Sequence, residues 1–268
     1  MKSLMTLAAL VLSSVIPVEA EVVNSLSDCS EFFLHQIPPD IPGITEKGNI
    51  LEKRRYKPIC QTFKNSRTFM TLYDTVNKIP VFSASKYRGH SAGITKSFWM
   101  IEPQAGTKDY VNYQGFDKGQ LWPISYGLND IDKKSSLTLT NVVPQEATFL
   151  KGSWNRMEKC VRCVLNEYCI NGNNDTKVFI ITGANPSRKK FLNNKINIPS
   201  KLWSAFCCYS RSQKQWLASA HWGMNEKHKS TLIDILNNMP FFLLFKKNVS
   251  LFNIMPHSNV LISCRNPT

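Results

Sequence analysis

The stretch GFDKGQLWP, residues 115–123, has the composition of an active-site strand. It places an acid, Asp117, a base, Lys118, and an amide, Gln120, around Gly119. An amide has no accessible pKa, so Gln120 cannot take a proton from water near neutral pH. Lys118 carries a positive charge but lacks the planar fork through which arginine binds phosphate with two hydrogen bonds. The stretch therefore combines charged and polar side chains with no histidine or other general base at Gln120.

Histidines elsewhere in the chain could supply that base. There are five of them: His35, His90, His221, His228 and His257. For each, a surface or core position without a chemical role is the simpler interpretation. His221 and His228 lie in a polar stretch, which predicts solvated side chains.

Cysteine usage and the amino terminus indicate an oxidising compartment. Residues 1–20 combine a basic start, a short apolar run and a small-residue V-x-A site, which predicts a signal peptide cleaved after Ala20. No later stretch is long enough to predict a membrane-spanning helix. The even number of cysteines predicts disulfides without fixing their pairing. They are Cys29, Cys60, Cys160, Cys163, Cys169, Cys207, Cys208 and Cys264. The C-x-x-C at 160–163 lacks further ligands at zinc spacing, so disulfide formation is favoured over metal binding.

The remaining chain, residues 21–268, is expected to form one secreted, glycosylated domain. Asn174 and Asn248 lie in sequons and are the expected glycan sites. The formal net charge of +14 favours polyanionic partners such as nucleic acid, anionic glycans or membrane surfaces. Charge alone does not choose among these partners.

Strand-like segments outnumber helical ones. Apolar, β-branched runs predict strands over 68–76, 79–87, 97–103, 136–144 and 177–183, and the last reads as a central strand. Between the last two, apolar residues from Trp154 to Tyr168 recur at helical spacing, and Ser153 could cap that helix. A second helix is expected at 230–236. Because the strands and helices do not alternate regularly, the predicted class is α+β.

Six ordered phrases resemble the DNA/RNA non-specific endonuclease family, which carries a ββα-metal active site. They cover nearly all of the mature chain. They are RRYKPICQTFKNSRTFMTLYDTVNKIPVFSA, FWMIEPQ, GFDKGQLWP, LTLTNVVPQEATFLKGSWNRMEK, VFIITGANPS and IPSKLWSAFCC. The resemblance implies a central, largely antiparallel sheet with a ββα finger and flanking helices. It also implies cleavage of DNA or RNA with one Mg²⁺ ion in the active members.

The family signature D-R-G-H falls on residues 117–120, so Gln120 occupies the slot of the general-base histidine. The slot of the Mg²⁺-binding asparagine is Leu150, which offers no oxygen to a cation that requires hard oxygen ligands. The rest of the linking phrase matches, at Asn141, Pro144, Gln145, Gly152, Trp154 and Glu158. Among these, the resemblance makes Glu158, Gln145 and Asn141 the remaining candidates around a metal. YRGH at 87–90 looks like a displaced signature, but it comes too early and lacks the following spacing.

A cationic surface is expected to remain even if hydrolytic activity is lost. Several basic side chains lie in or near segments that flank the family's groove: Arg88, Lys96, Lys118, Lys151, Arg156 and Lys159. Trp122 could stack on a base, although packing in the core is the simpler interpretation.

Three functions follow, and the sequence leaves all three open. The first, which Gln120 and Leu150 favour, is a secreted nucleic-acid-binding protein with impaired or lost catalysis. The second is an active Mg²⁺-dependent endonuclease with a rearranged site that uses Glu158 and Gln145. The third is a secreted module on a nuclease scaffold that binds protein or glycan.

Overall fold

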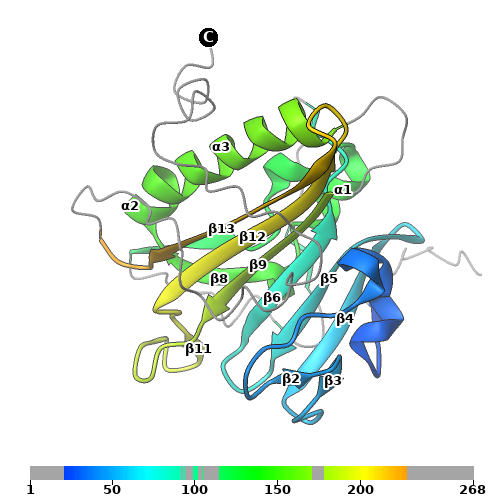
Figure 1. Cartoon of the computed structure of the whole chain (residues 1–268). Coiled ribbons are helices and arrows are strands. Elements are labelled where there is room, and N and C mark those ends of the chain that lie inside the picture. The colour runs from blue at the N-terminus through cyan, green and yellow to red at the C-terminus, as the bar shows by residue number, and fades with distance from the viewer. Residues whose placement is uncertain are drawn as a thin grey trace, which may run out of the picture.

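A seven-stranded antiparallel sheet forms the centre of the molecule (Figure 1). The computed structural model describes residues 21–91, 93, 99–101, 105, 115–170 and 178–227. The strands of the sheet, in spatial order, are β1 (Glu21–Val22), β4 (Tyr56–Phe63), β5 (Ser66–Asp74), β6 (Ile79–Lys86), β9 (Val178–Asn185), β12 (Lys201–Ser210) and β13 (Gln215–Met224). Three two-stranded pairs complete the β-structure: β2 (Thr45–Glu46) with β3 (Asn49–Ile50), β7 (Phe116–Gln120) with β8 (Val142–Glu146), and β10 (Phe191–Leu192) with β11 (Ile196–Asn197).

The helices are few and short, apart from one continuous helical stretch. α1 (Asp130–Ser135) precedes the 3₁₀ turn η5 (Leu139–Asn141). The stretch runs through α2 (Ala147–Phe149), the π-turn η6 (Leu150–Trp154), α3 (Asn155–Val164) and a second π-turn, η7 (Leu165–Cys169). The 3₁₀ helices η1 (Leu26–Phe32), η2 (Leu34–Gln36) and η4 (Ile124–Tyr126) complete the set within the described residues. None of the helices in this part of the chain is long and apolar enough to cross a membrane. The predicted α+β class is confirmed.

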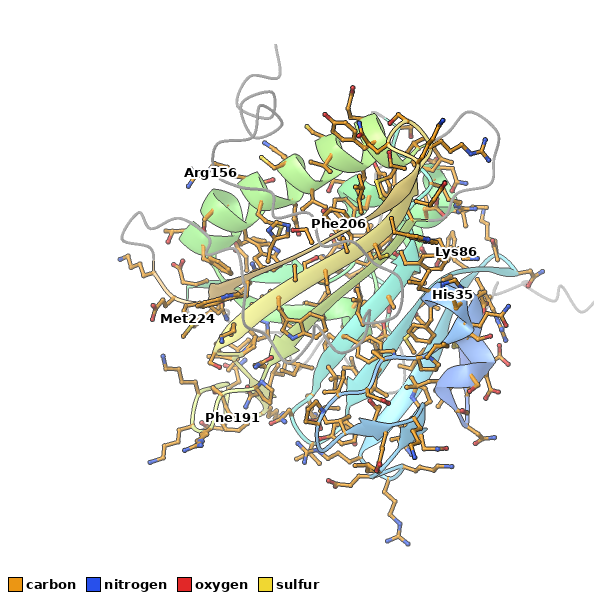
Figure 2. The ribbon with its side chains drawn as sticks, in the orientation of Figure 1. His35, Lys86, Arg156, Phe191, Phe206 and Met224 are labelled. Carbon is orange, nitrogen blue, oxygen red and sulfur yellow. A yellow bond between two sulfur atoms is a disulfide. The ribbon has the colours of Figure 1, made fainter. Side chains whose placement is uncertain are left out.

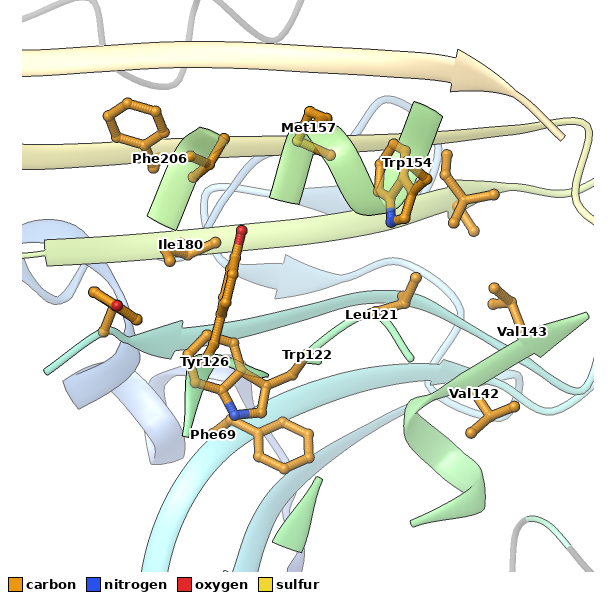
Figure 3. Close-up of a cluster of buried hydrophobic side chains, with 14 of the residues drawn as sticks. Phe69, Leu121, Trp122, Tyr126, Val142, Val143, Trp154, Met157, Ile180 and Phe206 are labelled. Carbon is orange, nitrogen blue, oxygen red and sulfur yellow. The ribbon is translucent and has the colours of Figure 1, made fainter. Parts of the chain in front are cut away.

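The sheet is covered on both faces, which gives the protein two hydrophobic cores. Met157 and Val161 of α3 pack with Ile180 and Phe206 of the sheet in one core, and Trp154, Leu121 and Val143 join it (Figure 3). On the other face, Phe32 and Phe33 pack with Phe82 and Trp203. Alternate residues of a strand face opposite sides, so the central strands contribute to both cores. This burial explains why residues 177–183 read as a continuous apolar run.

Four of the predicted elements match the structure and two details do not. β5, β6, β9 and α3 lie where the apolar patterns placed them. The predicted strand at 136–144 is wrong at its start, because η5 occupies 139–141 and β8 begins at Val142. Ser153 does not cap a helix, since the chain is already helical from Ala147 and Ser153 lies inside the helical stretch. The predicted strand at 97–103 lies mostly outside the described residues, as do the helix at 230–236, residues 1–20 and both sequons.

Two disulfides tie peripheral segments to the sheet. Cys29 of η1 pairs with Cys60 of β4, and Cys169 of η7 pairs with Cys208 of β12. Cys207 forms no disulfide within the described residues. Neighbouring residues of a strand point to opposite faces, so Cys207 points away from the face on which Cys208 meets Cys169. Cys163 is exposed on α3 and likewise has no disulfide partner there, and Cys264 lies outside the described residues. No group of three or more metal-binding side chains occurs in this part of the chain.

Candidate functional site

β7, β8 and the helical stretch form a ββα motif that brings most of the predicted site residues together. The strands are antiparallel, with Asp117 opposite Gln145 and Gln120 opposite Val142. A long connection that includes α1 and η5 joins β7 to β8, and α2 follows β8 directly. Leu150 and Glu158 then lie on successive parts of the helical stretch.

Gln120 is held by the protein at both ends of its amide. Its Nε2 donates to the backbone oxygen of Ser136 at 2.6 Å and contacts the Ser136 hydroxyl at 3.1 Å. Its Oε1 accepts from the backbone N–H of Ile124 at 3.4 Å, a long bond. Ser136 ends α1, so the side chain that the resemblance aligns with the general base anchors the connection between β7 and β8. The amide serves the fold and offers no proton acceptor for water.

The buried side chain of Asn141 forms hydrogen bonds to three separate segments of the chain. It is fully buried, and its Oδ1 accepts from the backbone N–H of Trp122 and from the Ser83 hydroxyl, both at 2.9 Å. Its Nδ2 donates to the backbone oxygens of Trp122 at 2.9 Å and Ser136 at 3.0 Å. Four hydrogen bonds account for the whole capacity of the amide. The structure therefore gives Asn141 a structural position and leaves no lone pair directed at a cation.

Gln145 and Gly119 are packed tightly against each other. A Cβ atom on Gly119 would lie 2.0 Å from Gln145 Oε1, so glycine is required for the two strands to approach. Gln145 is fully buried, and neither amide atom has a hydrogen-bond partner within the described residues. A buried unpaired oxygen could accept one bond from a cation's water, but it is a single ligand.

Leu150 and Asp117 are the other two positions to consider around a metal ion, and neither provides a well-placed free oxygen. Leu150 packs against the hydrophobic core and supplies no oxygen. Asp117 Oδ2 lies 2.7 Å from Lys151 Nζ, an ion pair without good hydrogen-bond alignment. Because exposed ion pairs contribute about 0–1 kcal/mol, this pair is readily broken. These residues do not fit a directly held Mg²⁺ ion, which requires several well-placed oxygens.

Glu158 differs from an ordinary carboxylate. Desolvation of its partly buried side chain raises its pKa to about 8, against weaker opposing effects of the Trp154 indole and the Arg162 guanidinium. The acid is therefore largely protonated at neutral pH. A protonated carboxyl is a poor cation ligand, so a cation would have to displace this proton before Glu158 could supply the oxygen that Leu150 lacks.

The basic residues of the predicted cationic surface differ in how available they are to a ligand. Arg156 and Lys159 are exposed on α3 (Arg156 in Figure 2). Lys118 lies over the ring of Trp99, with 4.9 Å between Nζ and the ring centroid. Arg88 donates to Asp132 at 2.7 Å, which compensates its charge. Lys96 lies outside the described residues.

Trp122 is packed in the core, as the simpler interpretation had it. Its side chain is 5 % exposed. Its ring meets that of Tyr126 edge to face, with 5.4 Å between centroids (Figure 3). It is not available to stack on a base.

The described histidines lie on segments other than β7. His90 contacts Asn166 at 3.1 Å in η7, at the far end of the helical stretch. Sixteen helical residues span roughly 24 Å, so His90 is remote from Leu150. The prediction that His221 is solvated is wrong, because its Nε2 is buried and burial lowers its pKa to about 4. His35 lies in a turn next to Trp216, and His228 and His257 lie outside the described residues.

Comparison with known proteins agrees with the ββα geometry. The model of the family described as DNA/RNA non-specific endonuclease matches residues 47–244. The chain is 26% identical over 208 residues to the human "Endonuclease domain-containing 1 protein" and 27% identical over 208 residues to its mouse counterpart. Each alignment covers 68% of this chain, which spans 39% and 38% of the two relatives.

A solved structure gives the same result for the fold. The crystal structure of the EndoG/EndoGI complex contains a chain that superposes with a TM-score of 0.54 at 16% identity. The superposition covers 69% of this chain and 88% of that chain. At this identity the likeness concerns the fold. Together with the family match over most of the sequence, it leads to one conclusion: the chain belongs to the DNA/RNA non-specific endonuclease family.

Proposed function

We propose that this protein is a secreted, nucleic-acid-binding member of the family that has lost phosphodiester hydrolysis. The observation that carries the proposal is the state of Gln120, whose amide occupies the general-base slot and is hydrogen-bonded to Ser136 and Ile124. Loss of a positioned base lowers a rate by about 10²- to 10⁴-fold. Secretion rests on the signal-like residues 1–20 and agrees with the two disulfides.

Loss of the metal ligand compounds the loss of the base. In a metal-dependent nuclease the divalent ion neutralises charge on the scissile phosphate as the bond breaks. In this chain Leu150 is apolar, Asn141 is committed to the fold and Glu158 holds a proton at neutral pH. Gln145 and Asp117 remain, and these two side chains are too few to hold a Mg²⁺ ion directly.

Binding does not need either of these groups. Lys118, Lys151 and Arg156 lie on or beside the motif, and the chain as a whole carries a net charge of +14. Phosphate contacts by lysine and arginine release counterions, so they provide affinity that depends on salt and tolerates any sequence. The scaffold thus supports a cationic surface without hydrolytic chemistry.

Binding is tested by fluorescence anisotropy with labelled DNA and RNA across a salt series. We expect affinity that falls steeply with salt and is unchanged by a chelator. The triple variant Lys118→Gln/Lys151→Gln/Arg156→Gln should reduce the salt slope by about 2–3, because each lost phosphate contact removes about one. Arg88→Gln is the control, and its effect should be small because the buried Asp132 compensates this charge, whereas the Lys151–Asp117 pair is exposed and readily broken. Absence of binding by the natural sequence would sink the proposal.

A further inference from the structure

One continuous part of the sheet is free of acidic residues. From Val178 to Asn225, which spans β9 to β13, the chain contains no aspartate or glutamate. Its basic residues are Arg188, Lys189, Lys190, Lys195, Lys201, Arg211 and Lys214. Four of them lie between β9 and β12, in and beside the small β10–β11 hairpin. The hairpin segment, residues 186–197, is therefore strongly cationic.

The hairpin segment is fixed by hydrogen bonds at its base. Asn197 accepts from the backbone N–H of Ser187 through Oδ1 and donates to its backbone oxygen through Nδ2, each at 2.8 Å. The Ser187 hydroxyl accepts from the backbone N–H of Lys190 at 2.9 Å and donates to its backbone oxygen at 3.0 Å. Asn193 and Asn194 adopt the left-handed conformation at the tip, which asparagine tolerates well. The basic residues are thus displayed on an ordered loop.

The three consecutive cations of this loop face solvent. Arg188, Lys189 and Lys190 are exposed, and none of the three forms an ion pair within the described residues. Phe191 follows directly and is 39% exposed, which is unusual for a phenylalanine. Figure 2 shows Phe191 at an edge of the molecule with nitrogen-bearing side chains around it. Cations beside an accessible aromatic ring are the pattern that binds a nucleic-acid strand.

The chain that follows the hairpin segment is linked to the ββα motif through the side chain of Asn225. Asn225 is buried, and its Nδ2 donates to the backbone oxygens of Pro199 at 2.8 Å and Pro144 at 3.0 Å. Its Oδ1 accepts from the backbone N–H of Glu146 at 2.8 Å. Pro199 follows β11, while Pro144 and Glu146 belong to β8. These hydrogen bonds therefore hold the end of β11 in a fixed position relative to the end of β8.

The geometry points to a second nucleic-acid contact on this segment: we infer that Arg188, Lys189 and Lys190 bind phosphates of a single strand while Phe191 stacks on a base. The inference rests on the proposed function and extends its surface away from the ββα motif. A single strand is favoured because its bases are accessible to a ring, whereas those of a duplex are stacked inside. Lysine and arginine side chains supply the sequence-independent part of the affinity.

The test compares two triple variants of equal charge. Arg188→Gln/Lys189→Gln/Lys190→Gln removes three positive charges from the hairpin segment. Lys53→Gln/Arg54→Gln/Lys64→Gln removes three exposed charges from the β4–β5 side of the sheet and leaves the same net charge. Affinity for a labelled single-stranded DNA of about 20 nucleotides is measured by anisotropy over a salt series.

We expect the hairpin variant to bind at least 10-fold more weakly, with a salt slope smaller by about 2 because each phosphate contact on a single strand contributes about 0.7. The control variant should change affinity less than 2-fold. Phe191→Ala should weaken single-strand binding by about 5-fold or more and leave duplex binding unchanged. Circular dichroism and thermal melting confirm that each variant is folded.

Equal losses in the two triple variants would overturn the inference, because general attraction to the chain would then explain the binding. A second pair of results would also overturn it. If Phe191→Ala binds single-stranded DNA as tightly as the natural sequence, and the hairpin variant loses as much affinity for a sulfated glycan as for DNA, the loop is a contact for any polyanion. In both cases the natural sequence still binds nucleic acid, so the proposed function survives. Failure of the natural sequence to bind would overturn both.

Discussion

Replacement of Asn141 by aspartate is expected to destabilise the protein by about 4 kcal/mol. The substitution preserves shape but removes both N–H donors, and a carboxylate would then face the backbone oxygens of Trp122 and Ser136. Unsatisfied buried groups cost about 1–3 kcal/mol each, and an uncompensated buried charge costs about 3–5 kcal/mol. Urea unfolding followed by circular dichroism and fluorescence measures the change, provided the two probes give coincident transitions.

This variant distinguishes a structural from a metal-binding Asn141. A cation ligand would tolerate aspartate, which offers a charged oxygen in the same place. Asn141→Leu is a useful companion, because it removes all four hydrogen bonds without introducing a charge. An Asn141→Asp protein with near-normal stability and a new or tighter affinity for Mg²⁺ would contradict the structural role.

Glu158→Gln is expected to be more stable than the natural sequence at pH 8.5, by about 2–3 kcal/mol. The folded protein raises the pKa of Glu158 from 4.5 to about 8, whereas the unfolded chain releases the proton near the lower value. The natural protein therefore loses stability as the pH rises through this window, because unfolding releases a proton. The full shift would correspond to about 5 kcal/mol, but partial exposure of the side chain reduces it.

The pH dependence is measured by urea unfolding of both proteins between pH 4 and 9. Glutamine resembles the protonated acid, so the two stabilities should be similar near pH 4.5 and diverge as the pH rises. Subtracting the two curves removes contributions from other titrating groups. Parallel curves would mean that Glu158 is ionised in the folded protein, and a carboxylate would then be available near the motif after all.

Local patterns in the sequence predicted the elements whose burial follows directly from their own residues. The apolar runs predicted β5, β6 and β9, and the apolar stripe predicted α3, because each of these elements packs in a hydrophobic core. The 3₁₀ turn at 139–141 could not be predicted, because it depends on hydrogen bonds from Asn141 to Trp122 and Ser136. The ββα motif itself was expected from the family resemblance.

The site was predictable in its residue types and not in its contacts. Gln120 and Leu150 can be recognised at their slots, but the bonds from Gln120 to Ser136 depend on how α1 folds back on β7. The burial of His221 likewise depends on its place in β13, since a polar neighbourhood in sequence can still be covered in space. The acid-free stretch from Val178 to Asn225 was visible in the sequence, and it became meaningful once the fold gathered four of its cations near one hairpin.

The measurement that tests the loss of catalysis most directly is nuclease activity of residues 21–268. Plasmid DNA and RNA are incubated with the protein and Mg²⁺ or Mn²⁺, with a chelator control and the Gln120→His/Leu150→Asn variant alongside. The natural sequence should bind both substrates and produce no divalent-dependent cleavage, whereas activity in the double variant would show that the cleft is otherwise intact. Cleavage by the natural sequence that the chelator abolishes would contradict the account and require another residue to act as the base.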